Sequence, residues 1–142
     1  MIKENPLQEF LGLEKRIINT KWVEYRDLPM YLDLVDVGLV LVQPLRRLMG
    51  ITPTKLFEYM ACGKPVIGSN LPGLEKIVSE TNCGMLVEHD DSKMLAEHIR
   101  TLHAAPDLCE KLGTRGYNAV RDKYNWELEA KKLVEFYKKT LE

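Results

Sequence analysis

Residues 52–70 read TPTKLFEYMACGKPVIGSN, and this stretch predicts a short helix joined by a tight turn to a buried strand. Thr52 is a natural N-cap, and Pro53 suits the first helical position, where no backbone N–H is needed. Apolar residues recur on one face of the expected helix at Leu56, Phe57, Met60 and Ala61. Gly63 can take the left-handed conformation that ends a helix, and Pro65 opens the strand because it cannot continue the helix.

The start of this helix is a candidate anion site. Glu58 lies at the border of the apolar face, and because helical side chains lean toward the N-terminus, we expect its carboxylate to point back over Thr54. A helix start also presents free backbone N–H groups and the positive end of the helix dipole, which favour a phosphate group. Thr52, Thr54 and Lys55 stand at that start.

Further motifs flank this stretch along the chain. They read VDVGLVLVQP at 35–44, NLPGLEKIV at 70–78, CGMLV at 83–87 and YNWELEA at 124–130. Together with the central string KLFEYMACGKPVI, these motifs resemble those of retaining glycosyltransferases with the GT-B fold, specifically the family-4 class, also called group 1. The resemblance covers nearly the whole chain, from about Pro6 to Leu141.

The resemblance implies a function. In that family the acidic residue that matches Glu58 contacts the donor ribose, and the positions that match Thr54 and Lys55 contribute backbone contacts to phosphate. A retaining hexosyltransferase of polysaccharide biosynthesis is therefore implied, which moves a sugar from a nucleotide-diphosphate donor, of the UDP or GDP type, to a glycan or lipid-linked acceptor. We expect donor binding by Glu58, Thr52, Thr54 and Lys55, with the nucleotide-sugar as substrate and with no cofactor and no metal.

Two positions depart from the family pattern. Gly50 stands where the first residue of an acidic pair should be, so no catalytic residue is assigned, and Pro53 removes an N–H from the loop that would hold the sugar. By the order of its motifs, the chain matches the family's C-terminal, donor-binding domain without the first two strands and without the acceptor domain. We therefore expect residues 1–142 to be a truncated single domain that is inactive in isolation.

Alternating strand and helix signals predict an α/β fold: a partial Rossmann-like parallel sheet of about four strands, with flanking helices and a helical C-terminus. Strands are expected at 16–21, 37–42, 65–69 and 84–87, and helices at 6–11, 28–34, 53–62 and 71–79 and from 92, 106 and 126 onward. The missing strands would leave the strand at 16–21 with an open edge, so we expect a homo-oligomer. Trp22 and Trp126 are expected to be packing anchors.

Composition excludes several classes of partner. The chain has 20 Lys and Arg against 21 Asp and Glu, so no overall field favours nucleic acid or an anionic membrane. The longest apolar run, 37–42, is far short of the roughly 20 residues of a transmembrane helix. Three cysteines without paired metal spacing and without a secretory leader favour the cytoplasm, while peripheral membrane attachment of a full-length protein stays open.

Other interpretations stay open at this point. Glu58 can be a surface carboxylate paired with Lys55 or Lys64, and Cys62 fits a small core residue. The chain can be a non-catalytic nucleotide-binding or assembly module, which Gly50 and the missing strands favour. A phospho-receiver domain fits poorly, because Asp36 precedes its strand and no acidic pair follows the first expected strand.

Overall fold

The computed structural model describes residues 12, 15–18, 20, 22–46 and 49–141. The chain falls into two units, residues 1–31 and 32–142. A 3-10 turn, η1 (Tyr25–Asp27), leads into helix α2 (Leu28–Asp33), which begins in the first unit and ends in the second. Asp27 is the last residue of that turn. The helix expected at 6–11 lies outside the described residues.

The second unit alternates strands with helices. In chain order it contains β1 (Gly38–Val40), α3 (Thr54–Ala61), β2 (Val66–Ser69), α4 (Pro72–Thr81), β3 (Gly84–Val87), α5 (Ser92–Ala104), α6 (Pro106–Asp122) and α7 (Trp126–Leu141). The strands form a three-stranded parallel sheet in the order β1-β2-β3. The predicted α/β class with a helical C-terminus is therefore confirmed.

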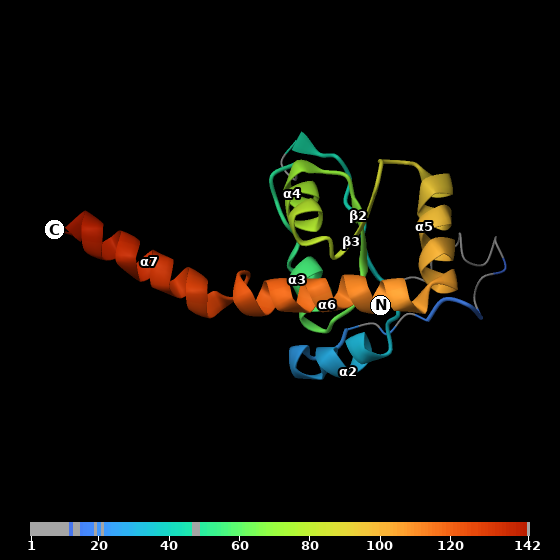
Figure 1. Ribbon diagram of the computed structural model, residues 1–142, viewed down its shortest axis with the longest axis horizontal. Coiled ribbons are helices and arrows are strands. Elements are labelled where there is room, and N and C mark those ends of the chain that lie inside the picture. Colours follow the sequence, from blue (N-terminus) through green and yellow to red (C-terminus); the bar gives the residue numbers. More distant parts are fainter. Residues whose placement is uncertain (1–11, 13–14, 19, 21, 47–48, 142) are drawn as a thin grey trace. The chain divides into compact units, whose positions relative to one another are not determined.

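Helices cover both faces of this sheet, with α4 and α5 on opposite sides of β2 and β3 (Figure 1). On one face, Val40 and Val66 pack with side chains of α3 and α4 such as Leu56, Met60 and Leu74. On the other face, a second cluster is made by Ile67, Val87, Leu102 and Leu112, which come from β2, β3, α5 and α6. Every strand residue of β2 is buried, as expected for a central parallel strand.

The turn between α3 and β2 follows the sequence expectation. Gly63 has φ +66°, the left-handed conformation that closes a helix without a Cβ penalty. Helix α6 crosses this turn so closely that a Cβ on Gly113 would lie 1.9 Å from the Gly63 carbonyl oxygen. A glycine on α6 thus permits the contact between α6 and the end of α3.

The prediction of a strand at 16–21 is wrong, because the described residues of this segment form no strand. Arg16 lies in a turn, and Ile17, Ile18 and Thr20 have irregular backbone. Ile17 and Ile18 are 42% and 88% exposed, so the apolar side chains that suggested a buried strand are not covered. A strand also needs a neighbour for its backbone groups, and the described residues of this segment have none. The described sheet therefore has three strands and not four.

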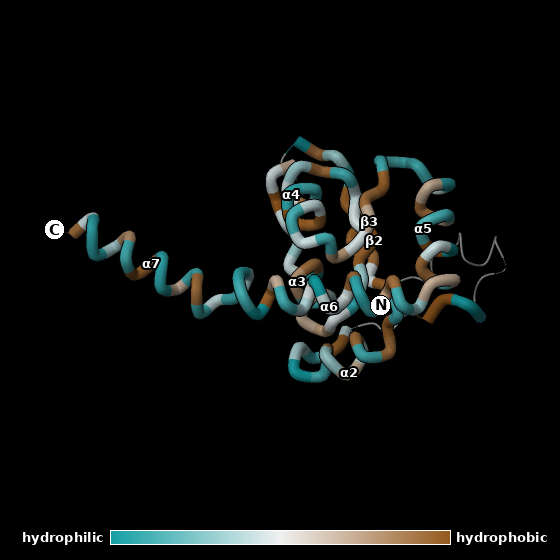
Figure 2. Tube along the Cα trace, viewed as in Figure 1, coloured by the Kyte–Doolittle hydropathy of each residue, from teal (hydrophilic) through white to brown (hydrophobic). Residues whose placement is uncertain are grey.

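The two tryptophans are also not packing anchors. Trp22 is 88% exposed and Trp126 is 73% exposed. Trp126 begins α7, whose apolar residues recur among hydrophilic ones along the helix (Figure 2). No residue of α7 is buried, so the periodic stripe that predicted this helix correctly is not covered by other described residues.

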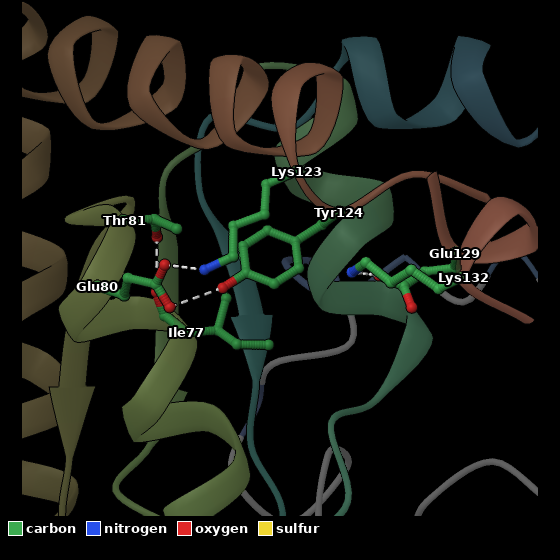
Figure 3. A network of polar contacts seen from close by, with 7 residues as sticks. All are labelled: Ile77, Glu80, Thr81, Lys123, Tyr124, Glu129 and Lys132. Atoms are coloured by element: carbon green, nitrogen blue, oxygen red, sulfur yellow. Dashed lines mark hydrogen bonds and ion pairs between the residues drawn. The ribbon is translucent and has the colours of Figure 1, made fainter. Parts of the chain in front are cut away.

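A polar network ties the junction of α6 and α7 to the end of α4 (Figure 3). Tyr124 Oη donates to Glu80 Oε2 at 2.9 Å, and Lys123 Nζ pairs with Glu80 Oε1. The Lys123 ammonium also lies 5.0 Å from the centre of the Tyr124 ring. That ring packs against the ring of Phe57 of α3, and the centres of the two rings are 5.6 Å apart. Hydrogen bonds from Lys123 and Tyr124 lower the pKa of the Glu80 carboxyl.

Candidate functional site

The carboxyl end of the sheet is the place where this fold assembles its loops. In a parallel sheet each helix runs back antiparallel to the strands, so α3 and α4 both begin at this edge. The long segment between β1 and α3 is held there by three contacts. Val42 N donates to Ser69 Oγ at 2.8 Å, Gly73 N donates to the Met49 carbonyl at 3.1 Å, and Thr52 Oγ1 donates to the Gly73 carbonyl at 3.1 Å.

The glycine at the start of α4 permits this loop to approach. A Cβ on Gly73 would lie 2.8 Å from the Ile51 carbonyl oxygen and 3.2 Å from the carbonyl carbon of Gly50. The loop that precedes α3 therefore packs directly on the first turn of α4. The two helix starts are joined through backbone contacts at this edge of the sheet.

Thr52 has a different role from the predicted one. Helix α3 begins one residue later than the sequence suggested, because Pro53 is the N-cap with extended φ −62° and ψ 136° and no side chain caps the helix. The Thr52 hydroxyl is turned instead to Gly73, where it holds the loop against α4. Thr52 thus positions the start of α3 without capping it.

The first turn of α3 is open. Thr54 and Lys55 are exposed, and the first intrahelical partner of the turn is the N–H of Leu56, which donates to the Pro53 carbonyl at 3.0 Å. Within the described part of the chain, no group accepts a hydrogen bond from the backbone N–H of Thr54 or Lys55. Uncapped donors and the helix dipole make this turn a suitable place for an anionic group.

Glu58 lies one turn further along α3. It is half-buried, and its helical position is roughly 200° around the axis from the buried Leu56, away from the core. Among the described residues it forms no ion pair, and Lys64 donates instead to the Asp33 carbonyl at 2.9 Å. The interpretation in which Glu58 pairs with Lys55 or Lys64 is therefore not supported.

Neighbours of Glu58 anchor α3 on the sheet. The Tyr59 ring lies against Gly38 of β1, where an added Cβ would overlap the ring. Burial raises the pKa of the Tyr59 hydroxyl, and the charge of Glu58 raises it to a smaller extent. Cys62 is half-buried, and burial, followed by the charge of Asp33, raises the pKa of its thiol. Cys62 is therefore not the buried core residue that the sequence suggested, and its raised pKa does not fit an activated nucleophile.

A hollow of about 360 Å³ opens at the same edge of the sheet. Residues 41–43 after β1, residues 87–92 at the end of β3 and Leu95 of α5 line this hollow. None of the four predicted donor residues lines it. The structure thus brings Thr52, Thr54, Lys55 and Glu58 together on α3 and the loop before it, while the hollow belongs to the ends of β1 and β3.

Polar groups order the rim of the hollow. Asn70 Nδ2 donates to Glu88 Oε1 at 2.5 Å, and His89 Nε2 lies 3.3 Å from Asp90 Oδ2. Asp91 Oδ1 accepts from Met94 N at 2.8 Å and so caps α5. Sequence reasoning did not single out Gln43 and Glu88 of this rim. Their signal is position, because both follow directly on predicted strands at the carboxyl edge.

The described residues contain no group of three His, Cys, Asp or Glu side chains that could hold a metal ion. None of the described helices has both the length and the apolar character required to cross a bilayer.

Comparison with known proteins agrees with this architecture. The family profile described as glycosyl transferases group 1 matches residues 2–105. The chain belongs to this family. The resemblance to GT-B-fold glycosyltransferases of group 1, which the motifs suggested, is thereby confirmed.

Individual relatives of this group 1 glycosyltransferase chain cover different shares of its length. Alpha-maltose-1-phosphate synthase of Mycolicibacterium smegmatis is 30% identical over 88 residues, which are 58% of this chain and 23% of that protein. Spore coat protein SA of Bacillus subtilis is 27% identical over 123 residues, 84% of this chain and 31% of that protein. The solved structure of sucrose-phosphate synthase from Thermosynechococcus elongatus is 26% identical and superposes with a TM-score of 0.83 over 96% of this chain and 33% of that one. The chain thus spans less than a third of the length of these two curated relatives.

Proposed function

We propose that this chain is the donor-binding part of a retaining hexosyltransferase. Its substrate is a nucleotide-diphosphate sugar of the UDP or GDP type, and the sugar passes to a glycan or lipid-linked acceptor in polysaccharide biosynthesis. Family membership supports sugar transfer as the chemistry. The donor, the retention of configuration and the acceptor are parts of the proposal.

One observation carries the proposal: the open first turn of α3 with an unpaired carboxylate one turn away. The N–H groups of Thr54 and Lys55 bind the donor diphosphate, and Glu58 accepts hydrogen bonds from hydroxyl groups of the ribose. Departure of a nucleoside diphosphate concentrates negative charge on its phosphates, and preorganised N–H groups stabilise that charge without reorganisation. Thr52 contributes by holding the loop before α3 on Gly73.

The same residues limit what the chain does alone. Gly50 supplies no carboxylate at the position of the family's first acidic residue, so we propose that the isolated chain binds donor but does not transfer sugar. We further propose that it forms one domain over residues 1–142, works in the cytoplasm and self-associates. A non-catalytic nucleotide-binding or assembly module is the second candidate, which Gly50 favours.

Calorimetric titration of the 142-residue chain with UDP and with GDP tests the site. We expect weak binding of one of them and at least a tenfold loss in Glu58→Ala. The matched control Glu97→Ala changes an exposed carboxylate of α5 and should bind like the wild type. Equal affinity in the Glu58 variant and the wild type would remove Glu58 from the site.

A second pair of variants tests the backbone contacts. Thr54→Pro deletes one N–H at the first helical position, where proline is well tolerated, whereas Thr54→Ala keeps that N–H. We expect the proline variant to bind nucleotide several-fold more weakly than the alanine variant. Equal binding by both variants would contradict the phosphate role of this turn.

Incubation of the chain with UDP-hexoses or GDP-hexoses should release no sugar, and turnover would contradict the proposed inactivity.

A further inference from the structure

The starts of α3 and α4 lie at the same edge of the sheet but use their backbone groups differently. At the start of α4, Pro72 has no N–H, and the N–H of Gly73 donates to a carbonyl of the loop before α3 at 3.1 Å. The next residue, Leu74, is fully buried, so no ligand reaches its backbone. At the start of α3, Thr54 and Lys55 are exposed, and no described group accepts from their N–H groups. The start of α4 is thus occupied by the protein itself, while the start of α3 is open.

The loop segment 49–52 is folded closely around Gly73. Its first residue, Met49, accepts the hydrogen bond from the Gly73 N–H, and its last residue, Thr52, donates its hydroxyl hydrogen to the Gly73 carbonyl at 3.1 Å. Between these two contacts, the Ile51 carbonyl oxygen would lie 2.8 Å from a Cβ added to Gly73. A single residue of α4 therefore sets the position of this segment, and the absence of a side chain there leaves room for it.

Helix α4 is fixed in the core and cannot easily withdraw from the loop segment. Leu74, Ile77 and Val78 of α4 belong to the core cluster on one face of the sheet and are at most 7% exposed. Protein interiors are close-packed and resist displacement of their side chains. A side chain at position 73 would therefore displace the loop segment and not the helix.

Such a displacement reaches the first turn of α3 because the link between loop and helix is stiff. Pro53 follows the segment directly, and its ring fixes φ, which is −62° here. The same ring restricts Thr52, the residue before it, to extended backbone. Beyond the turn, Leu56 is fully buried and fixes the helix in the core. Movement of Thr52 is therefore taken up by Thr54 and Lys55, which lie between the stiff link and Leu56.

We propose that Gly73 is a positioning residue of the donor site. It holds the segment 49–52 where Thr54 and Lys55 present their N–H groups to the diphosphate, and its own N–H is engaged by Met49, so it acts without contact to the donor. This role rests on the proposed function, because it concerns the same turn of α3. Donors that are already ordered bind an anion more tightly than donors that must first be ordered, since ordering costs conformational entropy. A side chain at position 73 should therefore weaken nucleotide binding from outside the binding contacts.

Calorimetric titration of the 142-residue chain with UDP and with GDP tests this role. Gly73→Ala should raise the dissociation constant of the nucleotide that binds the wild type at least tenfold. Gly113→Ala is the control for a general loss of stability, because its methyl meets the Gly63 carbonyl at the other end of α3, and the folded variant should bind like the wild type. A Gly73→Ala protein that binds as tightly as the wild type, or an equal weakening in Gly113→Ala, would overturn the proposal.

The Thr52 hydroxyl provides a milder pair of variants if Gly73→Ala does not fold. Thr52→Val keeps the shape of the side chain and loses the hydroxyl that donates to Gly73, whereas Thr52→Ser keeps the hydroxyl. We expect Thr52→Val to bind nucleotide several-fold more weakly than the wild type and Thr52→Ser to bind like the wild type. Equal affinities in these two variants would count against a position set through Gly73.

Amide NMR relaxation of the nucleotide-free chain separates this role from the donor site. Thr54 and Lys55 should be rigid in the wild type, with backbone order parameters of about 0.85, and should fall to about 0.6 in Gly73→Ala. Unchanged order parameters in that variant would refute the positioning role, with or without nucleotide binding. A wild type that binds neither UDP nor GDP would instead refute the donor site, so the two failures are distinguishable.

Discussion

Gly113→Ala should destabilise the fold at the crossing of α6 over the end of α3. The added methyl would lie 1.9 Å from the Gly63 carbonyl oxygen and 2.7 Å from its carbon, and both are backbone atoms. Because Gly63 already has φ +66°, the turn cannot withdraw freely. Overpacking of this kind costs about 1–3 kcal/mol. Because the overlapping atoms belong to the backbone, the cost should lie near the upper end of this range, about 3 kcal/mol. Alanine gains up to about 1 kcal/mol over glycine inside a helix, so we expect a net loss of about 2 kcal/mol.

Urea denaturation followed by circular dichroism measures this loss. Gly50→Ala is the matched control, because nothing lies within 4 Å of an added Cβ at that position. Its free energy of unfolding should stay within about 0.5 kcal/mol of the wild type. A Gly113→Ala protein as stable as the wild type would show that α6 does not pack on this turn as the structure has it.

Two further substitutions test contacts at opposite ends of the sheet. Ser69→Ala leaves the Val42 N–H without its acceptor and should lower the free energy of unfolding by about 1–3 kcal/mol. Ser69→Thr keeps the hydroxyl and should lower the free energy of unfolding by less. Equal losses in the two variants would refute the role of this oxygen. The pKa of Glu80 is lower in the folded state than in the unfolded state, so its stabilising effect is complete above the unfolded pKa and is lost as pH falls through the folded pKa. Glu80→Gln should therefore show a shallower decline of stability in acid, measured by urea denaturation across that range, and an unchanged slope would contradict the network with Lys123 and Tyr124.

Local signals predicted most of the second unit well. Gly63 and Pro65 marked the turn between α3 and β2, and the expected strand at 84–87 coincides with β3. These elements agree because a single local rule decides each of them: a left-handed glycine, a proline that stops a helix, or an apolar run buried on both faces.

The errors fall where tertiary context decides. The apolar pattern at 16–21 has no strand beside it among the described residues, and the stripe on α7 has no described partner, so periodicity alone did not predict burial. Thr52 has the chemistry of an N-cap, yet its hydroxyl donates to Gly73, a residue 21 positions away that no local pattern could reveal. The grouping of Thr54, Lys55 and Glu58 on α3 was predictable from helical spacing. The hollow between the ends of β1 and β3 depends on how distant loops meet, and spacing could not reveal it.

Helix α6 contributes Leu112 to one core cluster and packs against α3 and β3 near the other. The sheet and the helices on both of its faces therefore precede, in the chain, the segment that completes their burial. During synthesis on the ribosome, residues up to about 105 would leave the exit tunnel with apolar surface exposed on both sides of the sheet. We therefore expect the core of this unit to be completed only once α6 has left the ribosome.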